Sequence, residues 1–587
     1  MTAPLDRQAP MSSGEAAEPL TFDIREIPFS TRGSWINLSP IVGLHTTADQ
    51  VHLVSHVNGM HPVFRLGLER DGAPLEAQWW TCPSHHEWRT PDAVVAAAFD
   101  GPRTLRLRGR GAQLRLTEAA GELTPFTGGY LFLDPVDQSM VLTSYETGRR
   151  YCVRMLRGEL SGTGTEALGR SERSVLLGDR TGDWEAELVE ATTGVRRVGP
   201  RRTFEELVEA GAEAFATYAA MVAPWRSEDP ATTGRATYTL WSATVAPEGM
   251  LGRESVLMSK HWMDKLWSWD NCFNALALAP GLPDLALDQF LAPFDHQDEW
   301  GALPDSITHS EALYNYVKPP IHGWAFARLR QASPRALSRP ELELVHDRLS
   351  RWSDYWLTCR RVPGHVLPYY QHGNDSGWDN ATTFDLDRVV EAPDLAAFLA
   401  VQLDVLAGLA RELGHRTERW ERESEALVAA LLDQLWTPEG FVAVGASSGR
   451  RSGTTSLLTL LPLLLGDRLP ADVRRVMADK VREHLTDHGL ATELPSSPQY
   501  EEDGYWRGPV WAPSTALIEA GLRRSGYDEL ADEVSRRFRA LCERSGFAEN
   551  FGALTGAGLR DRAYTWTAAV YLTLSAAAVG AAGGDLA

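Results

Sequence analysis

Cysteine is scarce in this chain of 587 residues, which has only five. No two have the Cys-x-x-Cys spacing of zinc and redox sites, and an odd number cannot pair completely. We therefore expect no disulfide framework and favour reduced thiols in a cytoplasmic protein. The five lie far apart in the sequence, at Cys82, Cys152, Cys272, Cys359 and Cys542.

Basic residues are also few relative to acidic ones, with 57 Lys and Arg against 78 Asp and Glu, giving a net charge of −21. An acidic surface disfavours nucleic acid or an anionic membrane as a partner, but it leaves a small carbohydrate ligand open. The chain has no apolar run of about 18 residues, so we expect no transmembrane helix. Residues 1–19 lack the basic end and apolar core of a signal peptide, and we expect a disordered tail there.

The length predicts two or more domains. Residues 20–200 carry short apolar or alternating runs, such as VHLVSHV and TLRLRG, separated by Gly, Asp, Asn or Pro. This pattern is typical of an antiparallel β-sandwich. No cluster of His, Asp and Glu there forms a motif that indicates chemistry, so a packing or substrate-shaping role is the simplest interpretation.

Residues 201–258 read as a linker, with a helix over 202–225 and a strand pair in RATYTLWSATV. From 259 to 582 the pattern becomes helical, with polar loops between the helices. Together with the linker helix these make twelve helices, and six antiparallel hairpins of them predict an (α/α)6 barrel. The eleven helices expected in this part are 260–279, 284–294, 321–332, 340–360, 391–413, 417–436, 454–466, 471–486, 510–524, 527–545 and 563–581.

The long loops between these helices are rich in Trp, His, Asp and Glu, and loops of this length are usually functional or disordered. One of them is QHGNDSGWDNATTF, residues 371–384, which holds Asp375 and Asp379 beside Trp378. We predict that Asp379 is a catalytic acid, because burial beside Trp and other acids keeps a carboxyl protonated near neutral pH. Asp375 is expected to hold the loop and to raise the pKa of its neighbour.

A second candidate acid, Glu549, lies far along the chain in FAENFGALTGAGLRDRAYTWTAA, followed by Tyr564 and Trp566. An acid in such a loop can be simply solvated, but the glycine and aromatic context favours a catalytic role. Two carboxylates flanking a glycosidic bond hydrolyse it, and in inverting enzymes they stand about 6.5–9.5 Å apart. Glu549 is then the candidate base.

Three further segments offer substrate contacts, each with a plain structural alternative. Trp267, Trp269 and Asp270 in KLWSWDNCFNALALA can grip a sugar, or be two core Trp and a helix cap. The acids and His of FDHQDEWGALPDSI match no metal spacing, so a solvated loop or hydroxyl recognition, above all by Gln297, is favoured over a metal. Tyr505, Trp506 and Trp511 flank Arg507, which can hold a carboxylate or form a structural ion pair.

Lys318 and His322 in NYVKPPIHGWA can line the pocket, although His322 also fits a plain helix entrance. No cofactor and no metal is expected.

Taken together, WSWDNCFNALAL, FDHQDEWGALPDS, KPPIHGWA, GNDSGWDN, YWRGPVW and ENF…TG…YTWTAA resemble glycoside hydrolase family 63, and within it the bacterial mannosylglycerate and glucosylglycerate hydrolase-like members. The GWD element is also similar to that of family 37 trehalases. The resemblance implies an (α/α)6 barrel and inverting hydrolysis of α-glycosides, with Asp379 as acid and Glu549 as base. The residues that it places around the substrate are Trp267, Trp269, Asp270, Gln297, Gly301, Trp506 and Arg507. From their place beside the candidate acids we also expect Asp375, Trp378, Tyr505 and Trp566 to bind the substrate.

The leading hypothesis is an exo-acting, inverting α-glycosidase, most simply an α-glucosidase acting on a short glucoside. Alternatives are a glucosylglycerate or mannosylglycerate hydrolase, a trehalase-like enzyme, another enzyme of this barrel such as a phosphorylase or lyase, and a non-catalytic carbohydrate-binding protein. A phosphorylase should lack the base carboxylate, and a lyase needs grouped basic residues with a Tyr or His base, which the sequence does not display. A binding protein does not need two facing acids.

Overall fold

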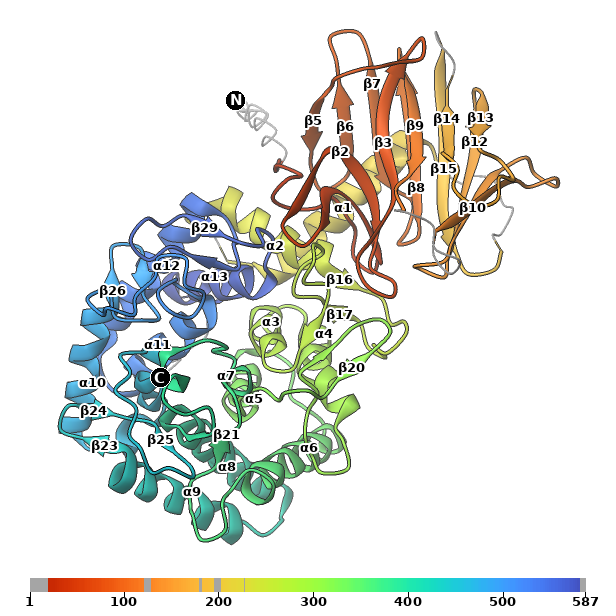
Figure 1. Cartoon of the computed structure of the whole chain (residues 1–587). Coiled ribbons are helices and arrows are strands. Elements are labelled where there is room, and N and C mark those ends of the chain that lie inside the picture. Colours follow the sequence, from red (N-terminus) through yellow and green to blue (C-terminus); the bar gives the residue numbers. More distant parts are fainter. Residues whose placement is uncertain (1–19, 121–127, 179–181, 195–201, 226, 581–587) are drawn as a thin grey trace, which may run out of the picture.

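The computed structural model describes residues 20–120, 128–178, 182–194, 202–225 and 227–580. Figure 1 shows two parts, a β-rich part from the N-terminal third of the chain and a larger helical part. The chain is therefore multidomain, with antiparallel β-sheets followed by a helical region, as the sequence predicted. The tail expected at residues 1–19 lies outside the described residues.

The β part consists of two antiparallel sheets, one with strand order β1-β2-β3-β9-β14-β13 plus β4 on β3, the other with order β10-β11-β12-β15-β8-β7-β6-β5. The first contains β1 (Ile36–Gly43), β2 (Thr46–Ser55), β3 (His61–Arg70), β4 (Ala73–Pro74), β9 (Gln113–Glu118), β13 (Leu160–Thr163) and β14 (Ser174–Leu177). The second contains β5 (Gln78–Thr81), β6 (His86–Arg89), β7 (Val94–Phe99), β8 (Thr104–Arg110), β10 (Gly129–Leu133), β11 (Met140–Ser144), β12 (Arg150–Arg157) and β15 (Asp183–Ala191).

Side chains from both sheets share one apolar core, because alternate residues of each strand face inward. Trp184 of β15 is fully buried in it, and its Nε1 donates to the carbonyl of Ala112 at 2.8 Å. A Cβ on Gly109 of the neighbouring strand β8 would lie 2.4 Å from this indole. Only glycine lets the ring pack there.

The helical part contains α1 (Phe204–Val222), α2 (Pro230–Ala243), α3 (Asp270–Leu278), α4 (Pro283–Leu291), η1 (Ala292–His296), α5 (His322–Ala332), α6 (Arg339–Thr358), α7 (Gly373–Ser376), η2 (Thr382–Phe384), α8 (Pro393–Leu413), α9 (Glu418–Ala430), η3 (Leu431–Leu435), η4 (Leu457–Arg468), α10 (Ala471–His484), α11 (Ala512–Arg524), α12 (Asp528–Ser545) and α13 (Thr565–Ala578). Short strands join them: β16 (Thr244–Val245), β17 (Ser255–Val256), β18 (Leu266–Trp267), β19 (Ser306–Ile307), β20 (Ala312–Leu313), β21 (Tyr369–Tyr370), β22 (Val390–Glu391), β23 (Trp436–Thr437), β24 (Gly440–Phe441), β25 (Val444–Gly445), β26 (Leu485–Thr486), β27 (Gly489–Leu490), β28 (Asn550–Phe551) and β29 (Gly558–Leu559).

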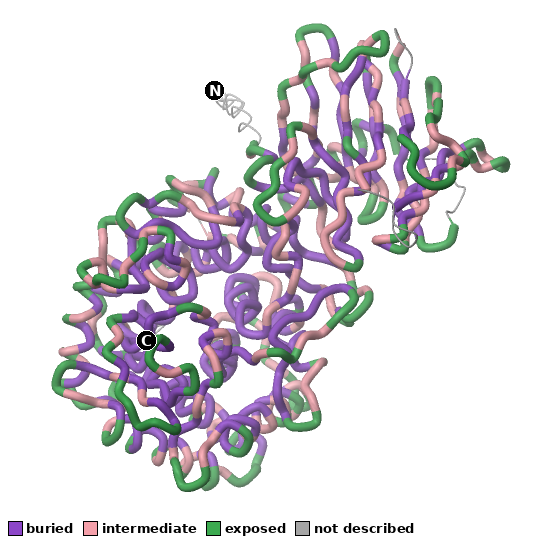
Figure 2. Tube along the Cα trace, viewed as in Figure 1, coloured by how far each residue is buried: buried purple, intermediate pink, exposed green. Residues whose placement is uncertain are grey.

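Six helical segments contact one another in the cyclic order α3, α5, α8, η4, α11, α13 and back to α3. The helices α4, α6, α9, α10, α12 and α2 lie outside them, each against one or more of the six. Figure 2 shows the same division, with buried segments toward the middle of the helical part and exposed turns around its rim. Helix α8 is long and apolar enough to cross a membrane, but 83% of its apolar window is buried inside the protein, so it is a core helix.

Two local predictions were wrong. The segment expected to form a strand pair, RATYTLWSATV, is mostly helix α2, because Asp229 accepts from the Thr232 N–H at 2.9 Å and Pro230 opens the first turn. Packing of Tyr238 and Leu240 in the core outweighs the β-branched residues around them. The helix expected over 260–279 begins only at Asp270.

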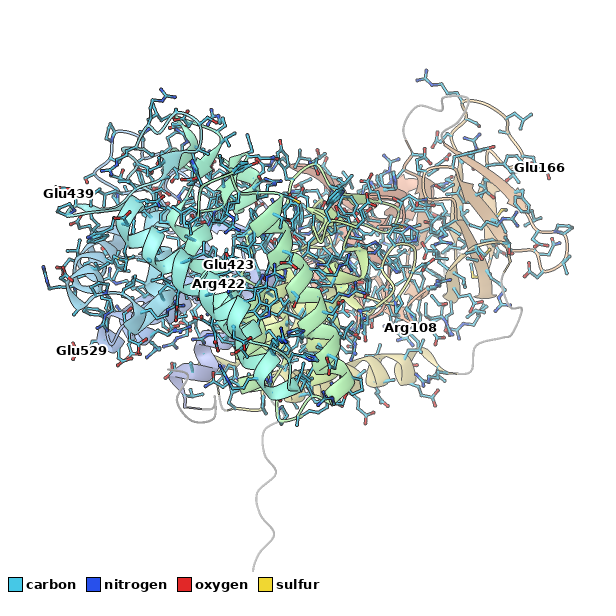
Figure 3. All side chains as sticks on the ribbon, turned by 90° about the horizontal axis from the view of Figure 1, so that it is seen from below. Arg108, Glu166, Arg422, Glu423, Glu439 and Glu529 are labelled. Carbon is cyan, nitrogen blue, oxygen red and sulfur yellow. The ribbon has the colours of Figure 1, made fainter. Side chains whose placement is uncertain are left out.

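Helix α1 connects the two parts of the chain. It begins with a capping box, in which the Thr203 side chain accepts from the Glu206 N–H and the Glu206 carboxylate accepts from the Thr203 N–H. It packs against β7 and α2, and Arg108 of β8, labelled in Figure 3, pairs with Glu205 and lies over the Phe204 ring. The linker helix thus docks on the β part through charge and apolar contact together.

Candidate active site

The loops that carry the sequence motifs precede inner helices. Asp270 opens α3, Lys318 comes just before α5, Asp379 precedes α8, Tyr505 precedes α11 and Glu549 precedes α13. Because neighbouring inner helices contact one another, the loops at their N-terminal ends can meet. The contacts below show that they do.

The loop with Asp379 is fixed by buried polar contacts. Asp375 is 1% exposed, forms an ion pair with Arg360 at 2.7 Å and accepts from the Gln371 N–H at 2.8 Å. A Cβ on Gly377 (φ +74°) would lie 2.4 Å from the Trp269 ring, so the turn there requires glycine. Asp375 therefore holds the loop, and the Asp379 side chain remains 30% exposed.

Lys318 lies at the centre of a group of acids. Its Nζ is 3.0 Å from Asp305 Oδ1 and 3.9 Å from Asp379 Oδ1, and it donates to the Asn374 carbonyl at 2.9 Å. The contact with Asn374 is a hydrogen bond, and the two contacts with carboxylates are ion pairs. Lys318 is thus committed to these protein groups and fixes the position of the acid.

The pKa of Asp379 is raised above its ordinary range, chiefly by burial and also by the charge of Asp305, while Lys318, His372 and Tyr505 lower it. The expected source of the shift, Asp375, is not among these main causes, because its charge is paired with Arg360. The neighbouring charge that raises the pKa of Asp379 is that of Asp305.

The Tyr505 turn joins the two candidate catalytic loops. Asn380 makes three hydrogen bonds to this turn. Its Nδ2 donates to the Gly504 carbonyl at 3.0 Å, and its Oδ1 accepts from the Trp506 N–H. Its backbone carbonyl accepts from Arg507 Nε. Tyr505 has φ +63°, a conformation that a bulky residue rarely adopts. Its hydroxyl is close enough to lower the pKa of both Asp379 and Glu549.

Glu549 lies at the end of this series of contacts. Paired backbone hydrogen bonds join Val510 and Phe551, and the Glu549 N–H donates to the Asp561 carbonyl at 2.7 Å. The side chain is 1% exposed, and neither carboxyl oxygen has a hydrogen-bond partner among the described residues. Burial and the charge of Asp561 raise its pKa to about 8, against the lowering effect of Arg560.

Five tryptophans form the floor of the site and each is at most 3% exposed: Trp269, Trp378, Trp506, Trp511 and Trp566. The Trp506 ring stacks on Trp511 with centroids 4.0 Å apart and lies 4.7 Å from Trp378. These rings support the candidate catalytic loops rather than offer open faces. Trp267, in β18, is only half-buried, so of the expected pair it alone keeps an accessible ring.

Asp270 is not the helix cap that was one interpretation of its position. It is the first residue of α3, only 3% exposed, and Trp269 before it makes no side-chain cap. Burial raises the pKa of Asp270 well above its ordinary range, although Lys318 opposes this, and Oδ1 lacks a partner among the described residues. A buried carboxyl with a free oxygen is suited to accept a sugar hydroxyl.

Four residues weighed as substrate contacts make contacts with the protein itself. Gln297 Nε2 donates to the carbonyls of Gly301 and Arg348, and a Cβ on Gly301 would lie 2.1 Å from the Arg351 carbonyl. Arg507 pairs with Asp385, which is the ion pair weighed as its alternative. His322 is buried against the Ser268 carbonyl at 2.8 Å.

Sequence reasoning did not single out Asp305, Asn380, Arg560 or Asp561. Asn380 could have been recognised from the sequence because it directly follows the candidate acid. Asp305 and Lys318 come together only in the folded chain.

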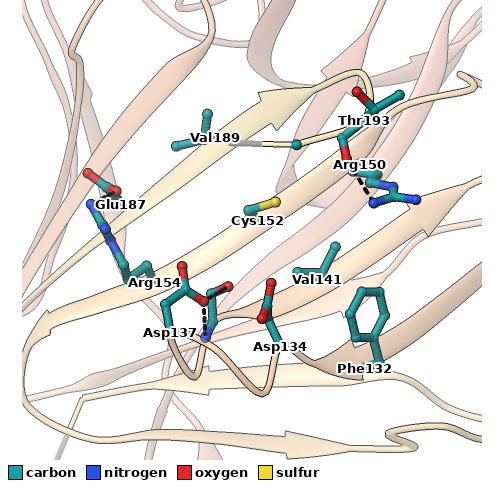
Figure 4. A pocket seen from close by; sticks show the side chains of 12 residues that line it. Phe132, Asp134, Asp137, Val141, Arg150, Cys152, Arg154, Glu187, Val189 and Thr193 are labelled. Atoms are coloured by element: carbon teal, nitrogen blue, oxygen red, sulfur yellow. Dashed lines mark hydrogen bonds and ion pairs between the residues drawn. The ribbon is translucent and has the colours of Figure 1, made fainter. Parts of the chain in front are cut away.

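No group of three or more His, Cys, Asp and Glu suited to a metal occurs in the described ranges. Figure 4 shows a hollow of ≈ 350 Å³ on the β part, lined in part by Arg154 and its ion-pair partner Glu187. Neither Asp379 nor Glu549 lines this hollow.

Comparison with known proteins identifies the family of the helical part. Residues 263–567, just over half of the chain, match the mannosylglycerate hydrolase MGH1-like glycoside hydrolase domain. Mannosylglycerate hydrolase MGH1 of Selaginella moellendorffii is 40% identical over 386 residues, which cover 52% of this chain and 79% of that protein. Mannosylglycerate hydrolase of Rubrobacter radiotolerans is 27% identical over 52% of this chain and 89% of its own.

Two solved structures show the likeness of fold. A family 63 mannosylglycerate hydrolase from Thermus thermophilus, in complex with glucose, has a TM-score of 0.53 at 20% identity and covers 58% of this chain and 98% of its own. A bacterial glucoamylase complexed with acarbose has a TM-score of 0.62 at 10% identity over 97% of this chain and 96% of its own. The chain is a glycoside hydrolase that belongs to the mannosylglycerate hydrolase-like group of glycoside hydrolase family 63.

Proposed function

We propose that this protein hydrolyses an α-glycoside of glycerate, mannosylglycerate or glucosylglycerate, with inversion at the anomeric carbon. One observation carries the proposal: the loops of two carboxyls far apart in the sequence, Asp379 and Glu549, are joined through one segment, which Asn380 binds at the Tyr505 turn and which pairs with Phe551 through Val510. The relatives named mannosylglycerate hydrolase support the glycerate substrate over the short glucoside that the sequence first suggested.

The exposure of the two acids supports their roles. Asp379 is partly exposed, which suits the acid that protonates the glycosidic oxygen of a departing group. Glu549 is enclosed, which suits a base that takes a proton from one water attacking the opposite face of the sugar. The acid loses one proton and the base gains one, and exchange with solvent restores both.

The cyclic contacts of the six inner helices support a closed (α/α)6 barrel as the scaffold. In such a barrel the loops at one end surround a single pocket, and the acid and base approach the sugar from different sides. Asp270 and the half-buried Trp267 then bind the sugar that is released, through a hydroxyl and a ring face respectively.

We expect mannosylglycerate or glucosylglycerate to be hydrolysed with kcat/KM at least about 100-fold above trehalose and maltose, since a built polar site rejects analogues that leave its groups unpaired. Trehalose belongs in the panel because a periplasmic trehalase of Pseudomonas aeruginosa is 28% identical over 198 residues, 32% of this chain. Proton NMR of early time points should show the β-anomer first. Initial release of the α-anomer would contradict inversion, and preference for a disaccharide would contradict the glycerate substrate.

The pH dependence of kcat/KM follows from the shared protons of the two acids. The active enzyme carries one proton on the two carboxyls together, whichever of them holds it at rest. The macroscopic pKa values of this pair therefore set the acid limb and the alkaline limb of the pH profile. Loss of that proton near the raised pKa of Glu549, about 8, removes the acid, so the rate should fall at higher pH. Below the raised pKa of Asp379 both carboxyls are protonated and no base remains. A bell-shaped profile is expected, and a rate that stays constant to about pH 10 would contradict it.

A further inference from the structure

The loop of residues 259–265, which ends just before β18, lies where the β part meets the candidate active site. Its own backbone closes a tight loop, with Ser259 N–H donating to the Met263 carbonyl and Met258 N–H to the Lys265 carbonyl. The family match begins at residue 263, within this loop, so the β part lies outside it. This loop therefore joins the catalytic domain of the family to a β part that the family match does not include.

Residues of the β part hold Lys260 from one side. Its Nζ donates to Ser30 Oγ at 3.0 Å and to the Ser34 carbonyl at 2.6 Å, and the residue is 1% exposed. Asn37 of β1 donates to the Lys260 carbonyl at 2.6 Å. Burial lowers the pKa of Lys260 well below its ordinary range, so its amino group depends on these hydrogen bonds for its polar contacts.

A second contact holds the other end of the loop. His56, just after β2, places Nδ1 3.0 Å from Asp264 Oδ2, and both side chains are buried. Asn37 Nδ2 lies 3.2 Å from His56 Nε2, so the amide donates there and the imidazole proton is on Nδ1, directed at Asp264. Burial lowers the pKa of His56 and keeps this neutral form.

His261, in the same loop, contacts the segment that carries the candidate base. Its Nδ1 is 3.0 Å from Asp561 Oδ1, with the two side chains 1% and 0% exposed. The Asp561 carbonyl accepts from the Glu549 N–H, and its carboxylate also accepts from the Ala563 N–H at 3.0 Å. Asp561 is thus fixed by His261 and itself fixes the backbone of the candidate base.

We propose that the β part positions the base: Lys260 and Asp264 tie the 259–265 loop to strands β1 and β2, and His261 of that loop holds Asp561 and, through it, Glu549. His56, Lys260, His261 and Asp561 are positioning residues. The proposal rests on the assignment of Glu549 as the base. It makes the β part a component of the catalytic unit rather than an appended module.

The test compares kcat and KM of full-length His56→Ala and Lys260→Met with His52→Ala as a matched control. His52 is a buried histidine of β2 whose Nδ1 lies near the Gln50 carbonyl instead of the loop. We expect kcat to fall by about 10- to 100-fold in the first two variants, because small displacements of a base are costly, with KM within about twofold. Thermal unfolding of each variant confirms that it is folded. If only one of the two variants folds, its kcat alone tests whether the β part positions the base.

Two further variants separate positioning from a general effect on the fold. In a His261→Asn background, adding Lys260→Met should lower kcat by less than about twofold, because both act along one route. Asp561→Asn should move the alkaline limb of kcat/KM to lower pH by about one unit, since it removes a like charge from beside Glu549. The groups that face Glu549 there are Asp561, Arg560, Tyr505 and Tyr564.

Folded His56→Ala and Lys260→Met proteins with unchanged kcat would overturn the proposal, as would full additivity with His261→Asn or an unmoved alkaline limb in Asp561→Asn. Failure of the proposed function looks different. In that case the wild-type protein releases no sugar from mannosylglycerate, glucosylglycerate, trehalose or maltose, or Glu549→Gln retains the wild-type kcat.

Discussion

Asp379→Asn is expected to lower kcat/KM on the glycosylglycerate substrate by about 10³- to 10⁴-fold, the upper part of the range for losing a general acid. Asparagine keeps the shape of the side chain but cannot give a proton to the glycosidic oxygen. The contacts of the loop do not depend on this carboxyl, since Asp375 and Asn380 hold it. Initial rates with purified variants measure the effect, and Asp387→Asn, later in the same loop and paired with Arg450, is the control.

A glycosyl fluoride separates the acid role from other roles of Asp379. Fluoride departs without a full proton transfer, so the α-glycosyl fluoride of the same sugar should lose less than about tenfold in rate with Asp379→Asn. Equal loss on the glycoside and on the fluoride would mean that Asp379 binds the sugar or acts as the base. Activity on the glycoside within a few-fold of wild type would remove Asp379 from the chemistry.

The sequence was sufficient to single out these two acids as candidates because each belongs to a motif whose local context restricts it. Asp379 follows a turn that only Gly377 can make over Trp269, and Glu549 precedes a glycine-rich loop. The order of strands and then helices also predicted the two parts of the chain, since hydrophobic period is a local property. What is local in the chain was therefore predictable.

The environment of the acids was not predictable, because it depends on contacts between distant residues. Lys318 meets Asp305 and Asp379 only when their three loops converge, and nothing in NYVKPPIHGWA distinguishes such a lysine from one in solvent. The same limit explains Gln297, whose amide binds the carbonyls that the fold places beside it. Whether a Trp faces a cavity or lies beneath it is likewise decided by tertiary packing, as the burial of Trp269 shows.

Glu549→Gln should remove hydrolysis of both the glycoside and the glycosyl fluoride, by about 10³-fold or more, because no other group replaces the base that activates the water. This is the opposite of the selective loss expected for Asp379→Asn, so the pair of variants assigns each role. Glu529→Gln, an exposed residue on α12 labelled in Figure 3, is the control and should retain wild-type rates. Rapid turnover of the fluoride by Glu549→Gln would show that the water is activated elsewhere.

The same variant should be more stable than the wild type, and the size of the gain should depend on pH. Glu549 has a folded-state pKa of about 8, above its ordinary value, so its contribution to stability is present at low pH and is lost as pH rises through 8. Glutamine cannot ionise, and it avoids this cost, which is at most a few kcal/mol. Thermal unfolding should give Glu549→Gln a higher Tm at pH about 8 and nearly the wild-type Tm at pH about 4. A gain independent of pH would mean that packing, and not the buried charge, separates the two proteins. A variant that is inactive yet more stable in this pH-dependent way would identify Glu549 as a group kept for catalysis at the expense of folding.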